Sequence, residues 1–302
     1  MESNSLTIDN PDESFLKLHI GTANFGTPYG VYGKSNLFEQ SDIKNILHEA
    51  SINKNIFVDT AESYFNSEII IGENAPFKLN NKITTKIIIE KNDKFDSITR
   101  RVKKSLTRVK QECFYNVLIH NAESLYKENA FEIVKGLESC ITEGLTQQIG
   151  VSCYEIGEIE YIKSNFNNIK NFQIPENVLD KRNFENIDLQ RLYLNGNSIT
   201  IRSIFLQGTL LSDLDLLPIF LHPEISKYAS VENFCLNNNV SKLKYCLDYA
   251  RSVKWKSGIV LGIQSYRQYE EIIKEISLPI KITNFPNEVL DEYFIDPRNW
   301  AL

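Results

Sequence analysis

At residues 57–68 the chain has the sequence FVDTAESYFNSE. The segment opens with apolar residues that are aromatic or β-branched, which predicts the end of a buried strand. It then turns polar and offers the carboxylate of Asp59 and the phenol of Tyr64 in or beside the following loop. Apolar residues after Ser67 predict a helix over 67–76 with this serine as its N-cap. A carboxylate and a phenol just beyond a buried strand indicate a chemical site.

Strands and helices are predicted to alternate on both sides of this segment. The expected strands lie near 16–20, 56–59, 82–86, 114–119, 147–151, 170–174, 198–202 and 257–261. The expected helices lie near 41–54, 67–76, 95–110, 124–143, 155–165, 183–194, 239–253 and 265–276, the first with Ser41 as its N-cap. Eight such units in about 250 residues favour an α/β fold of the closed (β/α)8 TIM barrel type. An open doubly wound sheet is the alternative, but the run GTANFGTPYG lacks its GxGxxG spacing.

The whole chain, residues 1–302, is expected to form one barrel domain, because no long linker or low-complexity tract divides it. A β-hairpin around an Asn-Pro-Asp turn is predicted over residues 5–18, where it would cap the barrel. The long connection 204–238 is expected to carry an extra helix. The tail after Leu278 is expected to be irregular.

Composition excludes several classes of protein. The 302 residues are 42% hydrophobic with a formal charge of −6, which argues against a nucleic-acid binder. No apolar run is long enough to span a membrane, and the polar, acidic start is not expected to be a signal peptide. Five cysteines without a CxxC pair are expected to be reduced thiols of a cytoplasmic protein. His19, His48 and His222 lack paired ligands at metal spacing, so no metal site is expected.

Titratable side chains follow three successive predicted strands. Asp59 and Tyr64 follow the second strand, Lys86 ends the third, and His120 ends the fourth. Because active sites of TIM barrels lie at the carboxyl ends of the strands, we expect these four groups to meet. Taken singly, each residue has an ordinary alternative role. Asp59 could cap a loop, Tyr64 could pack at the rim, Lys86 could be solvated, and His120 could be a hydrogen-bonded core imidazole. Together these alternatives lose weight, because a lysine at a buried strand end needs a partner and Asp59 is available.

These four groups suit the reduction of a carbonyl group. Hydride addition to a carbonyl carbon makes an alkoxide, which needs a proton from a general acid. Tyrosine has a pKa of about 10, which a neighbouring ammonium such as that of Lys86 is expected to lower. Asp59 can hold Lys86 in place, and His120 can hydrogen-bond the carbonyl oxygen and stabilise its developing charge.

Eight segments of the chain resemble the aldo-keto reductase superfamily in order and spacing. They are LHIGTANFG (18–26), FVDTAESYFNSE (57–68), TTK (84–86), SLTRVKQECFYNVLIHN (105–121), ESCITEGLTQQIGVSCY (138–154), FQIPENVLDKR (172–182), RSIFLQGTLL (202–211) and VLGIQSYRQYEE (260–271). The resemblance implies a (β/α)8 barrel with an N-terminal hairpin and a nicotinamide cofactor, usually NADPH. It also implies a catalytic tetrad of Asp59, Tyr64, Lys86 and His120. Because all four are present, an active enzyme is expected.

The resemblance further implies a set of cofactor-binding residues. They are Gly21, Thr22, Ser152, Gln173, Arg202, Ser203, Gln207, Gly208, Gly262, Gln264, Ser265 and Gln268. Among them, Ser152 and Gln173 match residues that bind the carboxamide, and Ser203, Gln207 and Gly208 match the loop that holds the pyrophosphate. Three positions depart from the family pattern: Cys153 and Ile272 stand where asparagines contact the carboxamide and the adenine, and Arg202 stands where an aromatic residue stacks on the nicotinamide. Arg202 is expected to meet a phosphate or an acidic substrate group, or else to form a structural ion pair. Gln264 aligns near a basic residue that grips the 2′-phosphate, although Arg267 lies close, so NADPH is expected and NADH is the alternative.

The substrate-binding walls are expected to include Asn24, Phe25, Tyr29 and Phe65, although ordinary packing at the rim is an equal alternative for the aromatics. The runs IGTAxFGxxYG and QIPxNVLDxR are similar to a branch of the family associated with bacterial surface-carbohydrate pathways. This similarity implies a small-molecule carbonyl substrate, such as a sugar or nucleotide sugar. Two other functions stay open: a redox-neutral sugar-modifying enzyme with bound NAD(P), and a non-catalytic cofactor-binding regulatory subunit.

Overall fold

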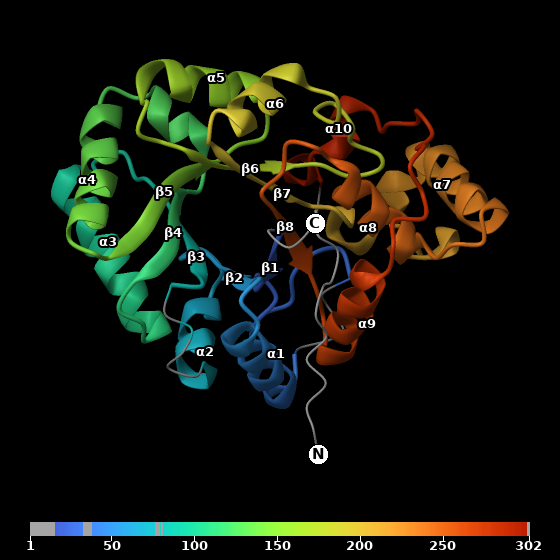
Figure 1. Cartoon of the computed structure of the whole chain (residues 1–302), viewed down its shortest axis with the longest axis horizontal. Coiled ribbons are helices and arrows are strands. Elements are labelled where there is room, and N and C mark those ends of the chain that lie inside the picture. The colour runs from blue at the N-terminus through green and yellow to red at the C-terminus, as the bar shows by residue number, and fades with distance from the viewer. Residues whose placement is uncertain (1–15, 33–37, 76–78, 80, 301–302) are drawn as a thin grey trace.

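The computed structural model describes residues 16–32, 38–75, 79 and 81–300 (Figure 1). Its centre is a closed barrel of eight parallel strands that follow one another in chain order. The predicted (β/α)8 TIM barrel is thereby confirmed. Of the predicted hairpin over residues 5–18, residues 5–15 lie outside the described part of the chain.

The strands lie within one residue of their predicted bounds. They are β1 Lys17–Gly21, β2 Ile56–Asp59, β3 Ile83–Ile87, β4 Phe114–Ile119, β5 Thr146–Ser152, β6 Asn171–Pro175, β7 Ser198–Arg202 and β8 Gly258–Gly262. In register, Gly21 pairs with Asp59 of β2 and with Gly262 of β8, which closes the barrel. The carboxyl ends of the first, second and last strands therefore lie at one level.

Ten helices accompany the strands within the described residues, and most of them ring the barrel (Figure 1). They are α1 Gln40–Ile52, α2 Ser67–Asn74, α3 Phe95–Val109, α4 Ala130–Thr142, α5 Ile156–Asn165, α6 Ile187–Leu194, α7 Ile225–Asn237, α8 Lys242–Ser252, α9 Tyr266–Ser277 and α10 Glu292–Ile295. The extra helix expected within 204–238 is α7. The helix predicted over 124–143 is divided into a 3₁₀ turn, Ala122–Tyr126, and α4. None of the helices in the described ranges has the length and apolar character needed to cross a bilayer.

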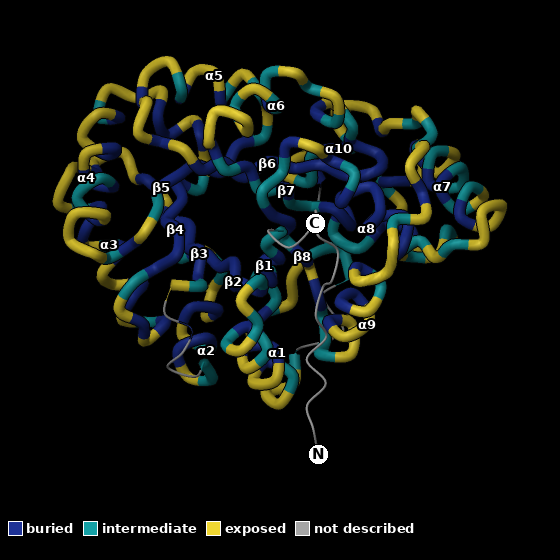
Figure 2. The backbone as a smooth tube through the Cα atoms, in the orientation of Figure 1, coloured by how far each residue is buried: buried dark blue, intermediate teal, exposed yellow. Residues whose placement is uncertain are grey.

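Hydrophobic periodicity explains how the helices pack on the barrel. In α3, Ile98, Val102, Leu106 and Val109 recur at helical spacing, and all four are buried. Figure 2 shows the same arrangement throughout, with buried residues along the strands and exposed residues on the outer faces of the helices. Burial of these apolar faces is the main stabilising contribution and gives the strand ends a rigid frame.

Two predicted helix caps are wrong. The helix α1 begins at Gln40 rather than after Ser41, and α2 has Asn66 rather than Ser67 as its N-cap. The hydroxyl of Ser67 instead donates to Thr22 Oγ1 at 2.7 Å and lies 3.1 Å from the hydroxyl of Thr60. This chain of hydroxyls fastens the loop after β1 to the segment that follows β2.

The interior of the barrel is polar toward the amino ends of the strands. Lys17 Nζ donates to the hydroxyl of Tyr115 at 2.6 Å, and the buried ring of His19 lies 5.2 Å from that of Phe57. Burial lowers the pKa of His19 to about 4, so this imidazole is neutral at neutral pH. Side chains of Thr84, Asn116 and Gln173 line the same small cavity, and each has a buried oxygen without a partner. Ordered water is the natural partner for such a cluster of polar atoms.

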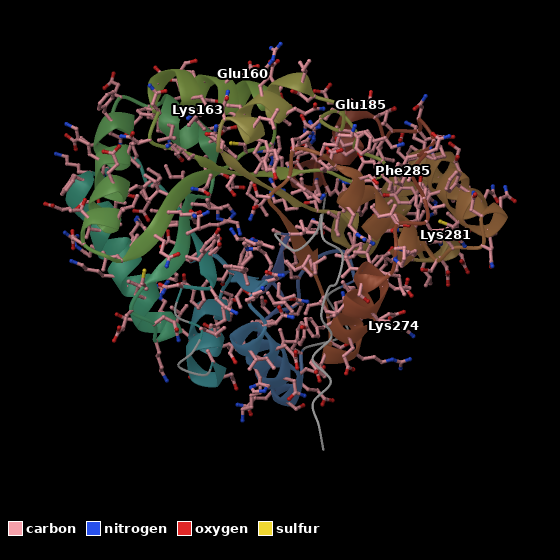
Figure 3. All side chains as sticks on the ribbon, in the orientation of Figure 1. Glu160, Lys163, Glu185, Lys274, Lys281 and Phe285 are labelled. Carbon is pink, nitrogen blue, oxygen red and sulfur yellow. The ribbon has the colours of Figure 1, made fainter. Side chains whose placement is uncertain are left out.

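The C-terminal tail is held against α8. The backbone N–H groups of Lys281 and Ile282 both donate to Asp248 Oδ2, at 2.9 and 3.1 Å. Phe285 packs on the rings of Tyr245 and Tyr249, at 5.6 and 5.1 Å between centroids. Figure 3 labels Lys281 and Phe285 in this part of the tail. These contacts guide the tail, which is irregular apart from α10 and one 3₁₀ turn, back toward the carboxyl ends of the strands.

Candidate active site

A buried ion pair joins the carboxyl ends of β2 and β3. Lys86 Nζ pairs with Asp59 Oδ1, and each residue is only 2% exposed. Lys86 Nζ also donates to the backbone oxygen of Thr60 at 3.3 Å, while Asp59 Oδ2 accepts from Gln173 Nε2 at 2.8 Å. A buried lysine is costly unless paired, and Asp59 supplies the expected partner. Both carboxylate oxygens of Asp59 are thus occupied.

Tyr64 lies over this pair. Lys86 Nζ is 5.3 Å from the centroid of the phenol ring. Burial raises the pKa of Tyr64 above its usual value, the charge of Asp59 raises it further, and Arg202 opposes them. The net lowering of this pKa expected from Lys86 is therefore wrong in the structure, because burial of the phenol raises the pKa and Asp59 adds to the rise. The phenol stays protonated at neutral pH, which is the form required of a proton donor.

His120 follows β4 and faces Tyr64. The two ring centroids are 6.0 Å apart and the rings are nearly perpendicular, at 84°. Burial, then the charge of Lys86, lowers the pKa of His120 to about 4. The neutral ring has its Nδ1 3.2 Å from Ser63 Oγ. When this hydroxyl donates to Nδ1, the proton sits on Nε2, which can then donate to a substrate oxygen. Sequence reasoning missed Ser63, because a serine in a polar loop gives no signal of its own.

Arg202 ends β7 and is half-buried. Its guanidinium carbon lies 4.2 Å from the ring centroid of Tyr154, and that of Arg298 lies 3.4 Å from the same centroid. Arg202 Nη1 donates to Ser203 Oγ and Nη2 donates to the backbone oxygen of Cys153, each at 3.3 Å. No carboxylate of the described residues comes within 4.0 Å of this guanidinium, so no structural ion pair forms with any of them. Tyr154 and Arg298 carried no sequence signal for this contact.

Several predicted cofactor residues lie together at the carboxyl ends of the strands. Gly21 pairs with Gly262 in register, and Ser152 pairs with Gln173. Gln173 gives its Nε2 to Asp59, while its Oε1 is buried without a partner. The Gln173 side chain also lines the interior cavity beside Thr84 and Asn116, where ordered water can serve this oxygen.

The loop after β7 has a strained backbone. Ser203, Leu206, Gln207 and Gly208 all have positive φ angles, of 61°, 44°, 54° and 90°. Gln207 also has a buried side-chain oxygen without a partner. Positive φ outside glycine is costly and is found where a loop is shaped for a ligand. The predicted phosphate-holding residues therefore sit in a loop whose shape fits that role.

Backbone N–H groups at the N-terminus of α9 donate to acceptors within the protein. Ser265 Oγ accepts from the backbone N–H of Gln268 at 3.2 Å, and Gln268 Oε1 accepts from that of Gln264 at 2.8 Å. The backbone N–H of Tyr266 donates to Asp42 Oδ2 of α1 at 3.0 Å. Helix N-termini bind anions, so Asp42 occupies a position where a phosphate would otherwise be attracted. Asp42 was missed because it is distant in sequence.

The predicted residues of the loop after β1 lie in different surroundings. Thr22 and Phe25 are fully buried: the Thr22 hydroxyl donates to the backbone oxygen of Asp59 at 3.1 Å, and Phe25 packs edge-on against Phe38. Their side chains belong to the core rather than to an open pocket. Asn24 Nδ2 donates to the backbone oxygen of Ile263, which links this loop to the segment after β8.

The predicted aromatic walls lie beside the phenol of Tyr64. Tyr29 is 50% exposed with its ring 6.3 Å from that of Tyr64, whereas Phe65 is 72% exposed with a φ of 40°. Within the described ranges, no group of three or more His, Cys, Asp or Glu side chains is placed to hold a metal ion. The arrangement is therefore one of proton donors and hydrogen-bond donors at the carboxyl ends of the strands.

Comparison with known proteins agrees with this geometry. The model of the aldo/keto reductase family matches residues 17–287. The chain belongs to the aldo/keto reductase family. Among solved aldo-keto reductases, the chain is similar to AKR11C1 from Bacillus halodurans in its holo form, with 19% identity over 87% of both chains and a TM-score of 0.67. It is also similar to the glycerol dehydrogenase AKR11B4 from Gluconobacter oxydans, with 18% identity over 88% of this chain and 87% of that one and a TM-score of 0.64. No curated protein matches the chain.

Proposed function

We propose that this protein is an NAD(P)H-dependent reductase that converts an aldehyde or ketone to an alcohol. The observation that carries the proposal is the buried Asp59–Lys86 pair beneath the protonated phenol of Tyr64, with the neutral ring of His120 beside it. Membership of the aldo/keto reductase family supports the same reaction class. We take Asp59, Tyr64, Lys86 and His120 as its catalytic residues.

The side chains have separate tasks in this reaction. The carbonyl carbon receives a hydride, which is the chemistry that a bound reduced nicotinamide supplies. Tyr64 gives its phenolic proton to the carbonyl oxygen, and His120 orients that oxygen through a ring N–H. Lys86 stabilises the phenolate that remains, and Asp59 fixes the position of Lys86. No metal is required, because the proton and the hydrogen bond neutralise the developing charge.

The predicted cofactor residues fit a dinucleotide. The buried, unpartnered amide oxygen of Gln207 lies in the loop expected to hold the pyrophosphate. The family generally uses NADP(H), but in this chain Gln264 is neutral and Asp42 brings a carboxylate to the α9 N-terminus. A 2′-phosphate there would meet like charge, so we infer that the protein binds NADH at least as tightly as NADPH.

The proposed substrate is a polar carbonyl compound, and we infer a sugar or nucleotide sugar of carbohydrate biosynthesis. The sequence runs around Gly21 and Pro175 support this inference through their similarity to that branch of the family. A single barrel domain would hold the whole site. The cysteines of the described segments, Cys113, Cys140, Cys153, Cys235 and Cys246, are all free thiols, which suits the reducing cytoplasm.

Purified wild-type protein and the Tyr64→Phe variant test the proposal. Fluorescence titration gives the Kd for NADH and NADPH, and nicotinamide absorbance follows turnover with a panel of aldehydes and sugars. Tyr64→Phe is expected to lower kcat by about 100- to 10,000-fold while leaving the Kd of the dinucleotide nearly unchanged, because the hydroxyl serves the proton. Full activity in this variant would refute the assignment of Tyr64.

The same experiment separates the other functions. Sugar conversion with a bound dinucleotide that shows no net oxidation would indicate a redox-neutral enzyme. Dinucleotide binding without turnover of any carbonyl would indicate a regulatory subunit. Binding of neither dinucleotide would refute all three.

A further inference from the structure

Arg202 differs from the other arginines that are shielded from solvent. Arg101, Arg108 and Arg251 each lie within 4.0 Å of at least one carboxylate. Arg202 has no carboxylate partner among the residues that the structure describes, although it is half-buried. Because an arginine keeps its charge at any working pH, a shielded and unpaired guanidinium is costly. The cost suggests that the guanidinium serves a ligand.

The guanidinium also has donors to spare. It carries five N–H groups, and its hydrogen bonds go to Ser203 Oγ and to the backbone oxygen of Cys153. The charge of Arg202 acts to lower the pKa of Asp180 and of Asp296, but the close contacts of these acids go to other arginines: Asp180 accepts from Arg182 at 2.9 and 3.1 Å, and Asp296 pairs with Arg298 at 2.6 Å. Within the described part of the chain, at least three of these N–H groups therefore lack an acceptor.

The position of Arg202 links it to the reacting groups. It ends β7 at the same rim of the barrel as Asp59 and Lys86. Its charge acts to lower the pKa of both Tyr64 and His120. At Tyr64 this opposes the larger effect of burial, and at His120 it adds to that effect. The stacking on Tyr154 holds the plane of the guanidinium in one orientation. A small molecule with its carbonyl between Tyr64 and His120 would have its remaining groups within reach of this plane.

We propose that Arg202 binds an anionic group, a carboxylate or a phosphate, on the carbonyl substrate. This inference rests on the proposed reductase function and narrows its substrate class to aldehydes or ketones that carry a negative charge. The planar guanidinium matches both oxyanions through paired, charge-assisted hydrogen bonds. The anionic group takes no part in bond making: it orients the substrate while Tyr64 protonates the carbonyl oxygen. A phosphate of the dinucleotide is the competing source of the same chemistry, and the test separates the two.

Matched substrate pairs test the proposal with the full-length protein. Butanal is compared with 4-oxobutanoate, and glyceraldehyde with glyceraldehyde 3-phosphate, at saturating dinucleotide. Wild type is expected to favour the anionic member of a pair in kcat/KM. Arg202→Gln is expected to lower the ratio of anionic to neutral kcat/KM by about 10- to 100-fold, the effect of losing a charge-assisted pair of hydrogen bonds. Arg202→Lys should restore part of the ratio, because it keeps the charge but not the paired geometry.

Two controls keep the result specific. Arg191→Gln makes the same change of charge on the surface of α6, where the side chain is 68% exposed, and should leave the ratio unchanged. Competition on wild type needs no variant: butanoate should inhibit the reduction of butanal more strongly than butanamide does. Circular dichroism establishes that each variant is folded.

The outcomes separate this inference from the function on which it rests. Equal kcat/KM for both members of each pair, with equal inhibition by butanoate and butanamide, would overturn the role of Arg202 and leave the reductase intact. A ratio unaltered by Arg202→Gln, together with a weaker Kd for the dinucleotide, would assign Arg202 to a cofactor phosphate and overturn the proposal. Absence of turnover with every carbonyl, despite dinucleotide binding, would instead refute the reductase.

Discussion

Substitution of Asp59 by asparagine should destabilise the protein through two neighbours at once. In the structure Oδ1 pairs with Lys86 Nζ and Oδ2 accepts from Gln173 Nε2 at 2.8 Å. Asparagine has a single carbonyl oxygen, so one of these donors loses its acceptor whichever way the amide lies. The oxygen is expected to face Lys86, which then keeps a dipole in place of a charge.

The size of the effect follows from burial. Breaking a buried ion pair by removing one partner costs about 3–5 kcal/mol, and an unsatisfied buried amide costs about 1–3 kcal/mol. With the amide oxygen retained toward Lys86, we expect Asp59→Asn to lower the free energy of unfolding by about 3–4 kcal/mol. The double variant Asp59→Asn with Lys86→Met should be less unstable than the sum of the single variants, because no buried charge is left unpaired.

Urea denaturation followed by circular dichroism measures these free energies for wild type, both single variants and the double variant. The coupling energy between the two sites is the quantity to compare. A loss of unfolding free energy below about 1 kcal/mol in Asp59→Asn, or strict additivity in the double variant, would refute the reasoning. Either result would mean that the two side chains do not form a buried ion pair whose members stabilise each other. Dinucleotide titration of Asp59→Asn shows whether the site keeps its shape.

Further substitutions and a change of pH also have defined outcomes. Ser63→Ala should lower kcat about tenfold, because the His120 tautomer with its proton on Nε2 is then no longer fixed. The Kd of the dinucleotide should stay unchanged. An equal kcat in wild type and variant would show that Ser63 does not position His120. Asp42→Asn should raise the affinity for NADPH relative to NADH by about 2- to 5-fold in fluorescence titration, and Gln264→Arg should add to that gain. The free energy of unfolding should fall as the pH is lowered from 6.5 toward about 4, because His19 is protonated more readily in the unfolded chain than in the folded one. His19→Asn should remove up to about 3 kcal/mol of this acid sensitivity, and an unchanged pH profile would contradict the burial argument.

The barrel was predictable from sequence because its signal is local. Each strand is a short apolar run, and each helix repeats its apolar residues at helical spacing, as in Ile98, Val102 and Leu106 of α3. The pairing of Lys86 with Asp59 was also predictable, since a buried lysine requires a carboxylate and the barrel places their strands side by side. Strand bounds therefore came out close to the observed ones.

The rest of the site depends on contacts between residues far apart in the chain. Ser67 fails as a helix cap because its hydroxyl donates to Thr22, and the backbone N–H of Tyr266 meets Asp42 where the neighbouring helices α9 and α1 lie side by side. The pKa of Tyr64 is raised instead of lowered because the phenol is buried and the charge of Asp59 adds to that effect. Such competition among partners is settled by three-dimensional packing, which periodicity and local propensity do not encode.

The closure of the barrel has a consequence for the order of folding. The strand β1 pairs on one side with β2 and on the other with β8, so Gly21 lies between Asp59 and Gly262. The contacts of β1 with β2 and of β2 with β3, which bring Asp59 to Lys86, join segments close in sequence and can form early. The pairing with β8 closes the longest loop in the barrel and bears the greatest entropic cost. During folding, the backbone amides around Asp59 and Lys86 should therefore gain protection from hydrogen exchange before those of the β1–β8 pairing beside Gly262 do.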